Sequence, residues 1–315
     1  MTFHKMLVPL DGSEQSAGIL PYAAQLAASL EIPVSLLTVI DPDASAVPER
    51  FRSPDEQARN DLEILQRSRI AEVEPAARRM LGNAAARLSN QGVTADYWVT
   101  KGVPAVEIVQ AAIDLECGLI AMSTHGRNIL SRAILGSVTD KVLHTSSVPV
   151  LTTTMAMKVD SPLEQVNISE AFVPLDGSAL AELALPHALD LAEKLSLPVS
   201  LVNVVDTGGP YQGLMDDARY VEVDVEIRSK ALEYLRKQSD DMRAKGINVR
   251  AIVRDGNPGV VLTELLREPR GRIVVMATHG LSGLTRWWLG SVTEVLVRSS
   301  ADPVLVIPTS EQSSD

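Results

Sequence analysis

The sequence has only one cysteine, Cys117, among its 315 residues. A single cysteine excludes an internal disulfide and any metal cluster that needs several cysteines. The N-terminal segment, residues 1–13 (MTFHKMLVPLDGS), also lacks the long apolar stretch of a signal peptide. Both absences are typical of a protein in the reducing cytoplasm, which is the location that we expect.

Basic residues are also in deficit. The chain has 29 Lys and Arg against 40 Asp and Glu, for a formal net charge of -11. Non-specific binding to nucleic acid or to an anionic membrane needs a basic face, so this composition argues against both partners. It does not argue against a local basic pocket for a small anion. No stretch of roughly 18 uninterrupted apolar residues occurs, so we expect no transmembrane helix.

Sequence motifs of the common catalytic machineries are missing as well. The five histidines have no spacing typical of a metal site, so we expect no resident transition metal. Neither the Gly-x-Ser-x-Gly elbow nor the Gly-x-x-x-x-Gly-Lys loop of P-loop ATPases occurs. No set of nucleophile, base and orienting group stands out, and the sequence therefore favours a protein that is not an enzyme.

What the chain does contain is an internal repeat. Residues 8–13 (VPLDGS) recur at 173–178, and residues 33–36 (PVSL) recur at 198–201. Further along, residues 124–126 (THG) recur at 278–280, 135–139 (LGSVT) at 289–293, and 149–151 (PVL) at 303–305. The offset falls from 165 to 154, so the first copy has 11 extra residues between about 41 and 102. A period this long indicates a duplicated domain, and we place the copies at 1–155 and 170–310, with a polar linker at 156–169 that contains Pro162.

Each copy alternates between strand and helix patterns. In the first copy we expect strands at 5–10, 34–40, 93–100, 118–123 and 148–153, and helices at 16–30, 55–90, 105–115 and 137–145. The second copy has the same order. This alternation predicts a parallel sheet with right-handed crossovers, and hence two tandem doubly wound, Rossmann-like α/β domains.

In such sheets a ligand binds beyond the carboxyl ends of the strands. Asp11 and Asp176 follow the first strand of each copy, and their carboxylates are suited to accept hydrogen bonds from a ribose or an amino group. Residues 11–13 also fit a plain turn with a helix cap. The glycines at 126 and 136, and at 280 and 290, would let backbone N–H groups approach an anion. Ser137 and Ser291, which follow, could cap a helix or donate to a phosphate.

Taken together, these motifs resemble the universal stress protein family, over nearly the whole chain. The ATP-binding pattern of that family is Gly, two residues, Gly, nine residues, Gly, then Ser or Thr. Here it runs from Ser123 through Gly126 to Gly136, and from Ala277 through Gly280 to Gly290, so the first glycine is replaced in both copies. The resemblance implies five parallel strands per domain in the order 3-2-1-4-5, and ATP, with or without Mg²⁺, as the ligand.

The resemblance also implies which residues contact the ligand. The adenine and ribose would lie against Pro9, Asp11, Val39 and Gly102 in the first copy, and against Pro174, Asp176, Val204 and Gly256 in the second. The phosphates would lie against Ser123, His125, Gly126, Arg127, Gly136 and Ser137, and against Ala277, His279, Gly280, Gly290 and Ser291. We expect the two histidines to order their loops, and Arg127 to strengthen polyphosphate binding at the first site.

Three functions are compatible with the sequence. The leading one is a cytoplasmic stress-response protein whose ATP occupancy is read by a protein partner. The second is an enzyme that hydrolyses ATP slowly or transfers adenylyl groups, although His4 alone does not supply the His-x-x-His motif expected of such a transferase. The third is a scaffold without nucleotide, for which Ser123 and Ala277 are the best support.

The last strand of each copy, at 148–153 and 304–308, is apolar and lies at a sheet edge. Edges of this kind tend to pair. The family resemblance implies that the two domains pack through these strands, so that one chain mimics a dimer, and two chains could then form a homodimer.

Overall fold

The computed structural model describes residues 3–42, 56–124, 135–157, 162–206, 218–268, 270–278 and 289–309, without the side chains of 56–67, 69 and 218–224. The first half contains β1(Met6–Pro9), α1(Glu14–Ala17), α2(Leu20–Leu30), β2(Val34–Ile40), α3(Glu56–Ser89), β3(Ala95–Lys101), α4(Pro104–Asp114), β4(Leu119–Ser123), α5(Ser137–Thr145) and β5(Val150–Thr153).

The second half repeats this order of elements. It contains β6(Glu170–Pro174), α6(Ala179–Glu182), α7(Ala184–Leu195), β7(Val199–Val205), α8(Ala218–Ala244), β8(Val249–Asp255), α9(Pro258–Leu265), β9(Arg272–Ala277), α10(Ser291–Ser299) and β10(Val304–Ile307). Helix α3 has 34 residues and α8 has 27, so the longer helix takes up part of the 11 extra residues of the first copy.

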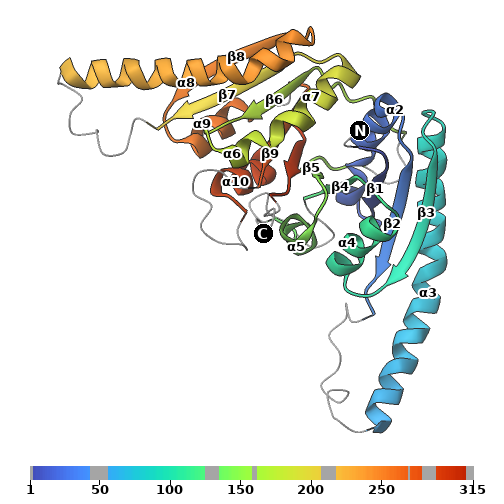
Figure 1. Ribbon diagram of the computed structural model, residues 1–315. Coiled ribbons are helices and arrows are strands. Elements are labelled where there is room, and N and C mark those ends of the chain that lie inside the picture. The colour runs from blue at the N-terminus through green and yellow to red at the C-terminus, as the bar shows by residue number, and fades with distance from the viewer. Residues whose placement is uncertain are drawn as a thin grey trace, which may run out of the picture.

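All ten strands form one sheet, in the order β3-β2-β1-β4-β5-β10-β9-β6-β7-β8. Within each half the strands are parallel and follow the expected order 3-2-1-4-5, which confirms the predicted fold. The halves meet where β5 pairs antiparallel with β10, with Leu151 opposite Leu305. This confirms the predicted pairing of the last strands, and Figure 1 shows the two halves meeting there, with α3 lying along β3 and α8 along β8.

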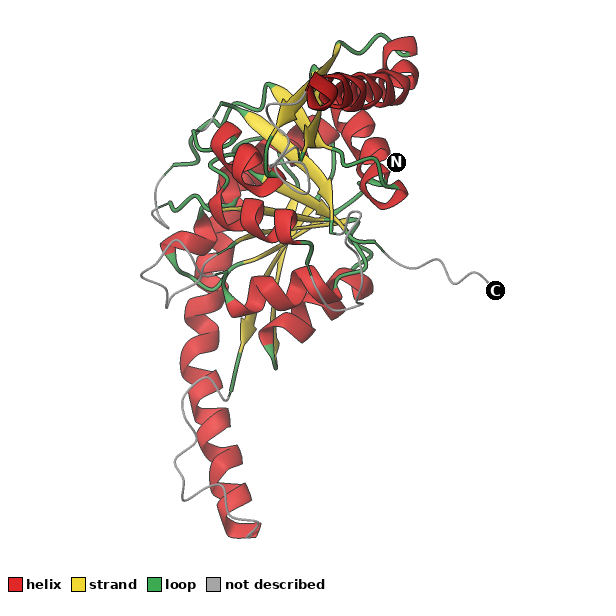
Figure 2. Cartoon of the chain, turned by 90° about the vertical axis from the view of Figure 1, so that its left-hand side faces the viewer, coloured by secondary structure: helices red, strands yellow, loops and turns green. Residues whose placement is uncertain are grey.

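Helices cover both faces of the sheet (Figure 2). One core cluster packs the first and second helices and the long helix of each half against the sheet, with Leu20, Leu81 and Leu191 almost fully buried. The other cluster packs α4, α5, α9 and α10 against the opposite face, with Val142 and Leu296 buried. Central strands such as β2 and β7 are buried along nearly their whole length, as expected for strands covered on both faces.

One predicted element is wrong. The single helix expected at 16–30 is two helices, α1 and α2, which meet at Gly18. A Cβ atom at Gly18 would come within 1.9 Å of the Met155 carbonyl oxygen, so the backbone after β5 packs directly on the break. The sequence pattern of Ala and Leu is continuous here, and only this long-range contact reveals the interruption.

The segment expected to be a polar linker packs on the core where it is described. Met157 and Ile168 are buried, and Leu163 and Val166 lie against the same core cluster. The backbone N–H of Met157 donates to the Glu14 carbonyl oxygen at 2.8 Å. Among the described helices, none is long and apolar enough to cross a membrane.

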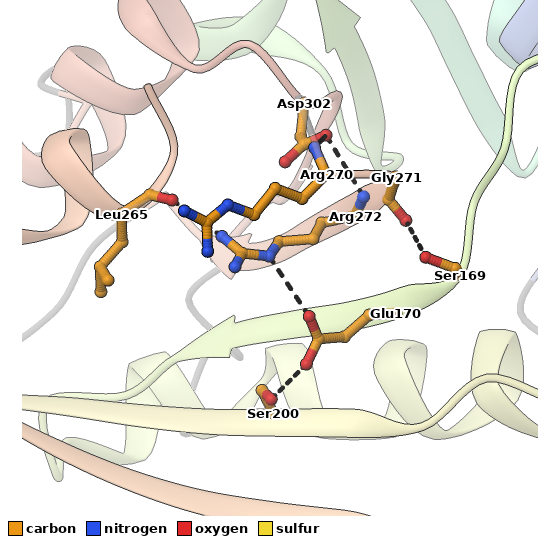
Figure 3. Close-up of polar contacts among 8 residues, drawn as sticks. All are labelled: Ser169, Glu170, Ser200, Leu265, Arg270, Gly271, Arg272 and Asp302. Atoms are coloured by element: carbon orange, nitrogen blue, oxygen red, sulfur yellow. Dashed lines mark hydrogen bonds and ion pairs between the residues drawn. The ribbon is translucent and has the colours of Figure 1, made fainter. Parts of the chain in front are cut away.

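At the amino ends of β6 and β9, charged side chains are fixed by a polar network (Figure 3). Arg272 Nε lies 3.2 Å from Glu170 Oε2, and its Nη1 donates to the Leu265 carbonyl oxygen at 2.8 Å. The Ser200 hydroxyl donates to the other oxygen of Glu170. The buried Asp302 accepts the backbone N–H of Arg272 at 3.2 Å. This network lies at the end of the strands opposite to the predicted ligand sites.

Candidate functional site

The predicted site residues lie at the carboxyl edge of each half of the sheet. Strand β1 pairs with β2 on one side and with β4 on the other, and β6 lies in the same way between β7 and β9. The chain therefore reverses its direction of winding at β1 and β6, which is where ligands bind in sheets of this type. Pro9 and Pro174 end these first strands, and Val39 and Val204 lie one residue before the ends of β2 and β7.

In the first copy Asp11 organises the turn after β1. Its Oδ1 accepts the backbone N–H of Ser13 at 2.9 Å and the Ser13 hydroxyl at 2.6 Å. The Ser13 hydroxyl oxygen in turn accepts the backbone N–H of Ser16 at 3.0 Å and caps α1. Gly12 between them has φ +81°. The turn-and-cap interpretation of residues 11–13 is therefore correct, and any binding role of Asp11 adds to it.

The second copy repeats this geometry. Asp176 Oδ1 accepts the Ser178 backbone N–H at 2.9 Å and its hydroxyl at 2.7 Å, and Gly177 has φ +88°. A side chain of the second strand then ties down the loop in each copy. Thr38 Oγ1 donates to the Leu10 carbonyl oxygen at 2.8 Å, and Asn203 Nδ2 donates to that of Leu175 at 2.7 Å. Neither Thr38 nor Asn203 was predicted as a site residue, although both lie in the repeated second strand.

A cavity in the second copy brings many of the predicted residues together. Six of the predicted site residues line it: Pro174, Asp176, Val204, Ala277, Gly290 and Ser291. The remaining lining is mostly apolar and was not predicted: Leu175, Ala181, Val202, Pro258, Leu262, Met276, Val292 and Thr293. The cavity therefore has apolar walls, an exposed carboxylate at one place and the start of a helix at another.

The helix starts at these sites are open. Gly136 and Gly290 are the N-caps of α5 and α10, and neither helix has a side-chain hydrogen bond at its cap. The alternative in which Ser137 and Ser291 cap these helices is therefore wrong, because each serine is the first helical residue and is exposed. The first N–H groups of a helix have no partner within it and attract anions.

A threonine tethers each of these helices to the strand before it. Thr139 Oγ1 donates to the Ser123 carbonyl oxygen at 2.8 Å, and Thr293 Oγ1 donates to that of Ala277 at 3.0 Å. Both threonines are buried. The sequence showed them only as part of the repeated LGSVT segment, so their tethering role was missed.

Ser123 and Ala277 occupy equivalent buried positions at the ends of β4 and β9. The Ser123 hydroxyl has no hydrogen-bond partner among the described residues. A buried hydroxyl normally has one. The two candidate sites thus differ by one polar atom at the position where the family pattern has its first glycine.

Gly102 and Gly256 follow β3 and β8 and have φ +146° and +121°, a region that side chains rarely adopt. A Cβ atom on Gly102 would also lie 2.5 Å from Glu107 Oε1. Backbone conformation alone therefore accounts for both glycines, and Gly256 does not appear among the described residues that line the cavity.

A residue of the first copy contacts the backbone next to the candidate site of the second copy. His144, on α5, uses Nε2 to accept the backbone N–H of Leu289 at 3.1 Å, while its Nδ1 lies 2.6 Å from the Asp140 carbonyl oxygen. Leu289 directly precedes the cap residue Gly290. This contact joins the two halves next to the candidate site, and no local sequence pattern predicts it.

The remaining predicted residues lie outside the described part of the chain: His125, Gly126, Arg127, His279 and Gly280. Among the residues that the structure does describe, no three His, Cys, Asp or Glu side chains gather as a metal site would require.

These features define a class: two doubly wound α/β units in one chain, joined edge to edge, with equivalent candidate ligand sites at the carboxyl ends of their strands. The chain belongs to the universal stress protein family, which matches residues 2–153 and again residues 170–308. The resemblance seen in the sequence is therefore confirmed, with one family match for each copy.

Some relatives match this chain over nearly its whole length. A universal stress protein of Mycolicibacterium smegmatis is 24% identical over 318 residues, which cover 97% of each chain. One from Mycobacterium tuberculosis is 24% identical over 315 residues, or 96% of each chain. The crystal structure of a universal stress protein from Archaeoglobus fulgidus aligns with 98% of this chain and 97% of its own, with a TM-score of 0.60 and 23% identity, and supports the fold.

Proposed function

We propose that each copy binds one adenine nucleotide, with ATP as the ligand, and that occupancy changes a surface read by a protein partner during stress. The observation that carries this proposal is the cavity of the second copy. Its apolar walls suit a base, the Asp176 carboxylate suits ribose hydroxyls, and the open start of α10 suits phosphates. These three chemistries are the ones that a nucleotide requires.

The roles of individual residues follow from their positions. Val204 borders the base, Asp176 accepts from the ribose, and Ser291 holds the phosphates with its backbone N–H and hydroxyl. Gly290 donates its own N–H to the Thr278 carbonyl oxygen at 2.7 Å, and its lack of a side chain leaves room for the phosphates. Asp11, Gly136 and Ser137 have the same roles in the first copy. A Mg²⁺ ion that arrives with ATP would neutralise phosphate charge, and no dedicated protein ligands for it are needed in this proposal.

Two further parts of the proposal concern the whole protein. Its working place is the cytoplasm, and its domains span 1–155 and 170–310, with 156–169 between them. It is a binding protein whose ATP hydrolysis is slow at most, because no side chain at the described sites is placed as a general base with an orienting partner. The alternative is a scaffold without nucleotide, which Ala277 favours because it adds a Cβ atom where the family pattern has glycine.

The substitution Ser291→Asp tests phosphate binding separately from folding. An acidic residue in the first turn of a helix stabilises the helix, but it repels a phosphate at the same place. We expect ATP affinity at the second site to fall by roughly tenfold or more, with the melting temperature unchanged or raised. Calorimetric titration with Mg-ATP measures the first effect, and thermal unfolding measures the second.

Ser299→Asp is the matched control, because Ser299 is exposed at the other end of the same helix. This variant should lose a little stability and bind ATP as the unmodified protein does. Equal ATP affinity in Ser291→Asp and Ser299→Asp would contradict the proposed phosphate site, and two sites without any ATP binding would favour the scaffold.

A further inference from the structure

A second cavity lies in the first copy, on the other side of the β1–α1 loop. It has a volume of about 230 Å³ and lies between this loop, helices α1 and α2, and the second half of α3. These helices cover the face of the sheet opposite to α4 and α5. The cavity is therefore separate from the proposed nucleotide site, although Gly12 and Ser13 of the loop after Asp11 form part of its wall.

Polar side chains line one wall of this cavity in a regular row. Arg79, Asn83 and Arg87 are four residues apart on α3, so they lie on one face of the helix, and all three line the cavity. Arg79 is exposed, whereas Arg87 is half-buried and also donates to Met157 Sδ at 3.9 Å. No acidic residue occurs among the described residues of the lining. In a chain with a net charge of -11, this is a local cationic wall.

The other walls are apolar or already hydrogen-bonded. Leu10, Ala17 and Met80 contribute apolar surface. The Ser13 hydroxyl donates to Asp11, and the Ser16 hydroxyl donates to the Ser13 carbonyl oxygen at 3.0 Å. The charge recognition in this cavity therefore rests on the arginines, and the rest of the space suits a short apolar group.

The second copy provides an internal comparison. The turns that end α3 and α8 have the same hydrogen bonds: Gly92 N–H donates to the Ser89 carbonyl oxygen, and Gly246 N–H donates to that of Arg243. In the register that this fixes, Leu81 corresponds to Leu235, and both are fully buried. The α3 residues that line the first cavity can therefore be matched with residues of α8. The repeat of residues 8–13 at 173–178 gives the match for the residues of α1.

In the second copy the matching space is filled. Tyr234 stands where the first copy has Met80, Gln238 where it has Ala84, and Glu182 where it has Ala17. Gln238 Nε2 donates to Glu182 Oε1 at 2.9 Å across the gap between the helices. Burial, followed by the adjacent Glu182 carboxylate, raises the pKa of the Tyr234 phenol. Larger and mutually bonded side chains thus occupy the position of the cavity.

The charge of the wall is also reversed. Glu233 and Asp241 of the second copy stand where the first copy has Arg79 and Arg87, and Lys237 stands in place of Asn83. The formal charge of these three positions therefore changes from +2 to -1. Since the two copies share a fold and differ here in both volume and charge, the open cationic cavity is not required by the architecture.

The geometry points to a binding site in the first copy for a small organic carboxylate with a short apolar chain. The guanidinium groups of Arg79 and Arg87 hold the carboxylate through charge-assisted hydrogen bonds, and Asn83 donates beside them. The apolar chain lies against Met80 and Ala84. Such a ligand would contact the loop that carries Asp11, and would therefore lie next to the proposed nucleotide site without overlapping it.

Hexanoate is the probe, with acetate and 1-hexanol as probes of the head group and the chain alone. No nucleotide is added, so the outcome is independent of ATP binding. We expect one hexanoate per full-length chain by calorimetry, with roughly tenfold weaker binding of acetate and of 1-hexanol. Arg79→Gln should weaken hexanoate binding by roughly tenfold, because it removes a charged donor from an exposed position that does not hold the fold.

Arg78→Gln is the matched control, since Arg78 neighbours Arg79 but pairs with Glu74 at 2.7 Å and does not line the cavity. It should bind hexanoate as the unmodified chain does. The double variant Ala17→Glu with Ala84→Gln introduces the residues of the second copy and should abolish binding. The proposal requires a Kd for hexanoate of about 1 mM or lower. It would be overturned if no hexanoate bound at about 10 mM, which is ten times that Kd. Equal affinity in Arg79→Gln and the unmodified chain, or equal affinity for acetate and hexanoate, would overturn it too.

Discussion

Ser123 is the residue at which the two candidate sites differ most simply. Its hydroxyl is buried at the end of β4, where the second copy has Ala277, and it has no hydrogen-bond partner among the described residues. A buried hydroxyl that lacks a partner costs free energy, and a ligand phosphate would supply the missing acceptor. Exchanging the residues at these two positions therefore tests whether the hydroxyl contributes to nucleotide binding.

We predict that Ser123→Ala weakens ATP binding at the first site by about three- to tenfold, while the free energy of unfolding without ligand rises by about 1 kcal/mol. Calorimetry with Mg-ATP and urea unfolding measure the two effects. The reciprocal variant Ala277→Ser should tighten the second site. A less stable Ser123→Ala protein with unchanged ATP affinity would show that this hydroxyl has a structural partner instead.

Because of Asp302, we expect the stability of the fold to depend on pH. It is buried, and burial is the largest influence on its carboxyl group, so the pKa lies above its ordinary value of 3.8 despite the hydrogen bonds from the backbone of Arg270 and Arg272. Because the folded-state pKa is raised, the contribution of this group to stability is fully present below pH 3.8 and is lost as the pH rises through the folded-state pKa.

In Asp302→Asn the amide oxygen can still accept the same backbone N–H groups, but it carries no charge. We predict that this variant gains stability relative to the unmodified protein between about pH 3 and pH 7. Urea unfolding at several pH values measures the difference, and the exposed Asp240→Asn serves as control. A difference that stays constant, or that falls with rising pH, would contradict the burial argument.

At the level of elements, the sequence predicts most of the fold because the strands and helices alternate with clear periods. Strand β2 and helix α5 were predicted with their exact bounds, and the other strands of the first half within two residues. The break between α1 and α2 could not be predicted, because it depends on the Met155 carbonyl oxygen packing against Gly18. Contacts between residues far apart in the sequence leave no local pattern.

In the candidate site, too, the residues in repeated motifs were predicted and the residues without a local pattern were not. The repeated motifs placed Asp176, Gly290 and Ser291 around one cavity, since the carboxyl ends of parallel strands meet at one edge. The apolar walls from α9 and β9, such as Leu262 and Met276, were not predicted, because nothing distinguishes them in sequence from ordinary core residues. The starts of α5 and α10 were predicted as helix N-termini, but Gly136 and Gly290 are their N-caps instead of Ser137 and Ser291.

For the whole molecule, the junction of the two halves has a direct effect on the second site. The β5–β10 pair makes one continuous sheet, and His144 of the first half accepts the backbone N–H of Leu289 beside Gly290. The halves are therefore coupled at the point where α10 begins. At the corresponding position in the second half stands Arg298, which pairs with Glu294 at 2.5 Å.

We predict that His144→Ala weakens ATP binding at the second site by about three- to tenfold, because the start of α10 loses its anchor. Binding at the first site should not change. Calorimetry in a Ser137→Asp background isolates the second site, and a Ser291→Asp background isolates the first. Arg298→Ala is the control at the matching position. An equal loss at both sites would indicate that His144→Ala disturbs the domain junction as a whole.

We propose above that this chain carries adenine nucleotide at the carboxyl edges of its two halves. The most direct measurement is to purify the full-length protein gently from cells, denature it, and identify the released nucleotide by chromatography and mass spectrometry. We expect ATP or ADP in near-stoichiometric amounts, from one to two per chain. A protein that releases no nucleotide, and whose melting temperature does not respond to ATP and magnesium, would contradict it.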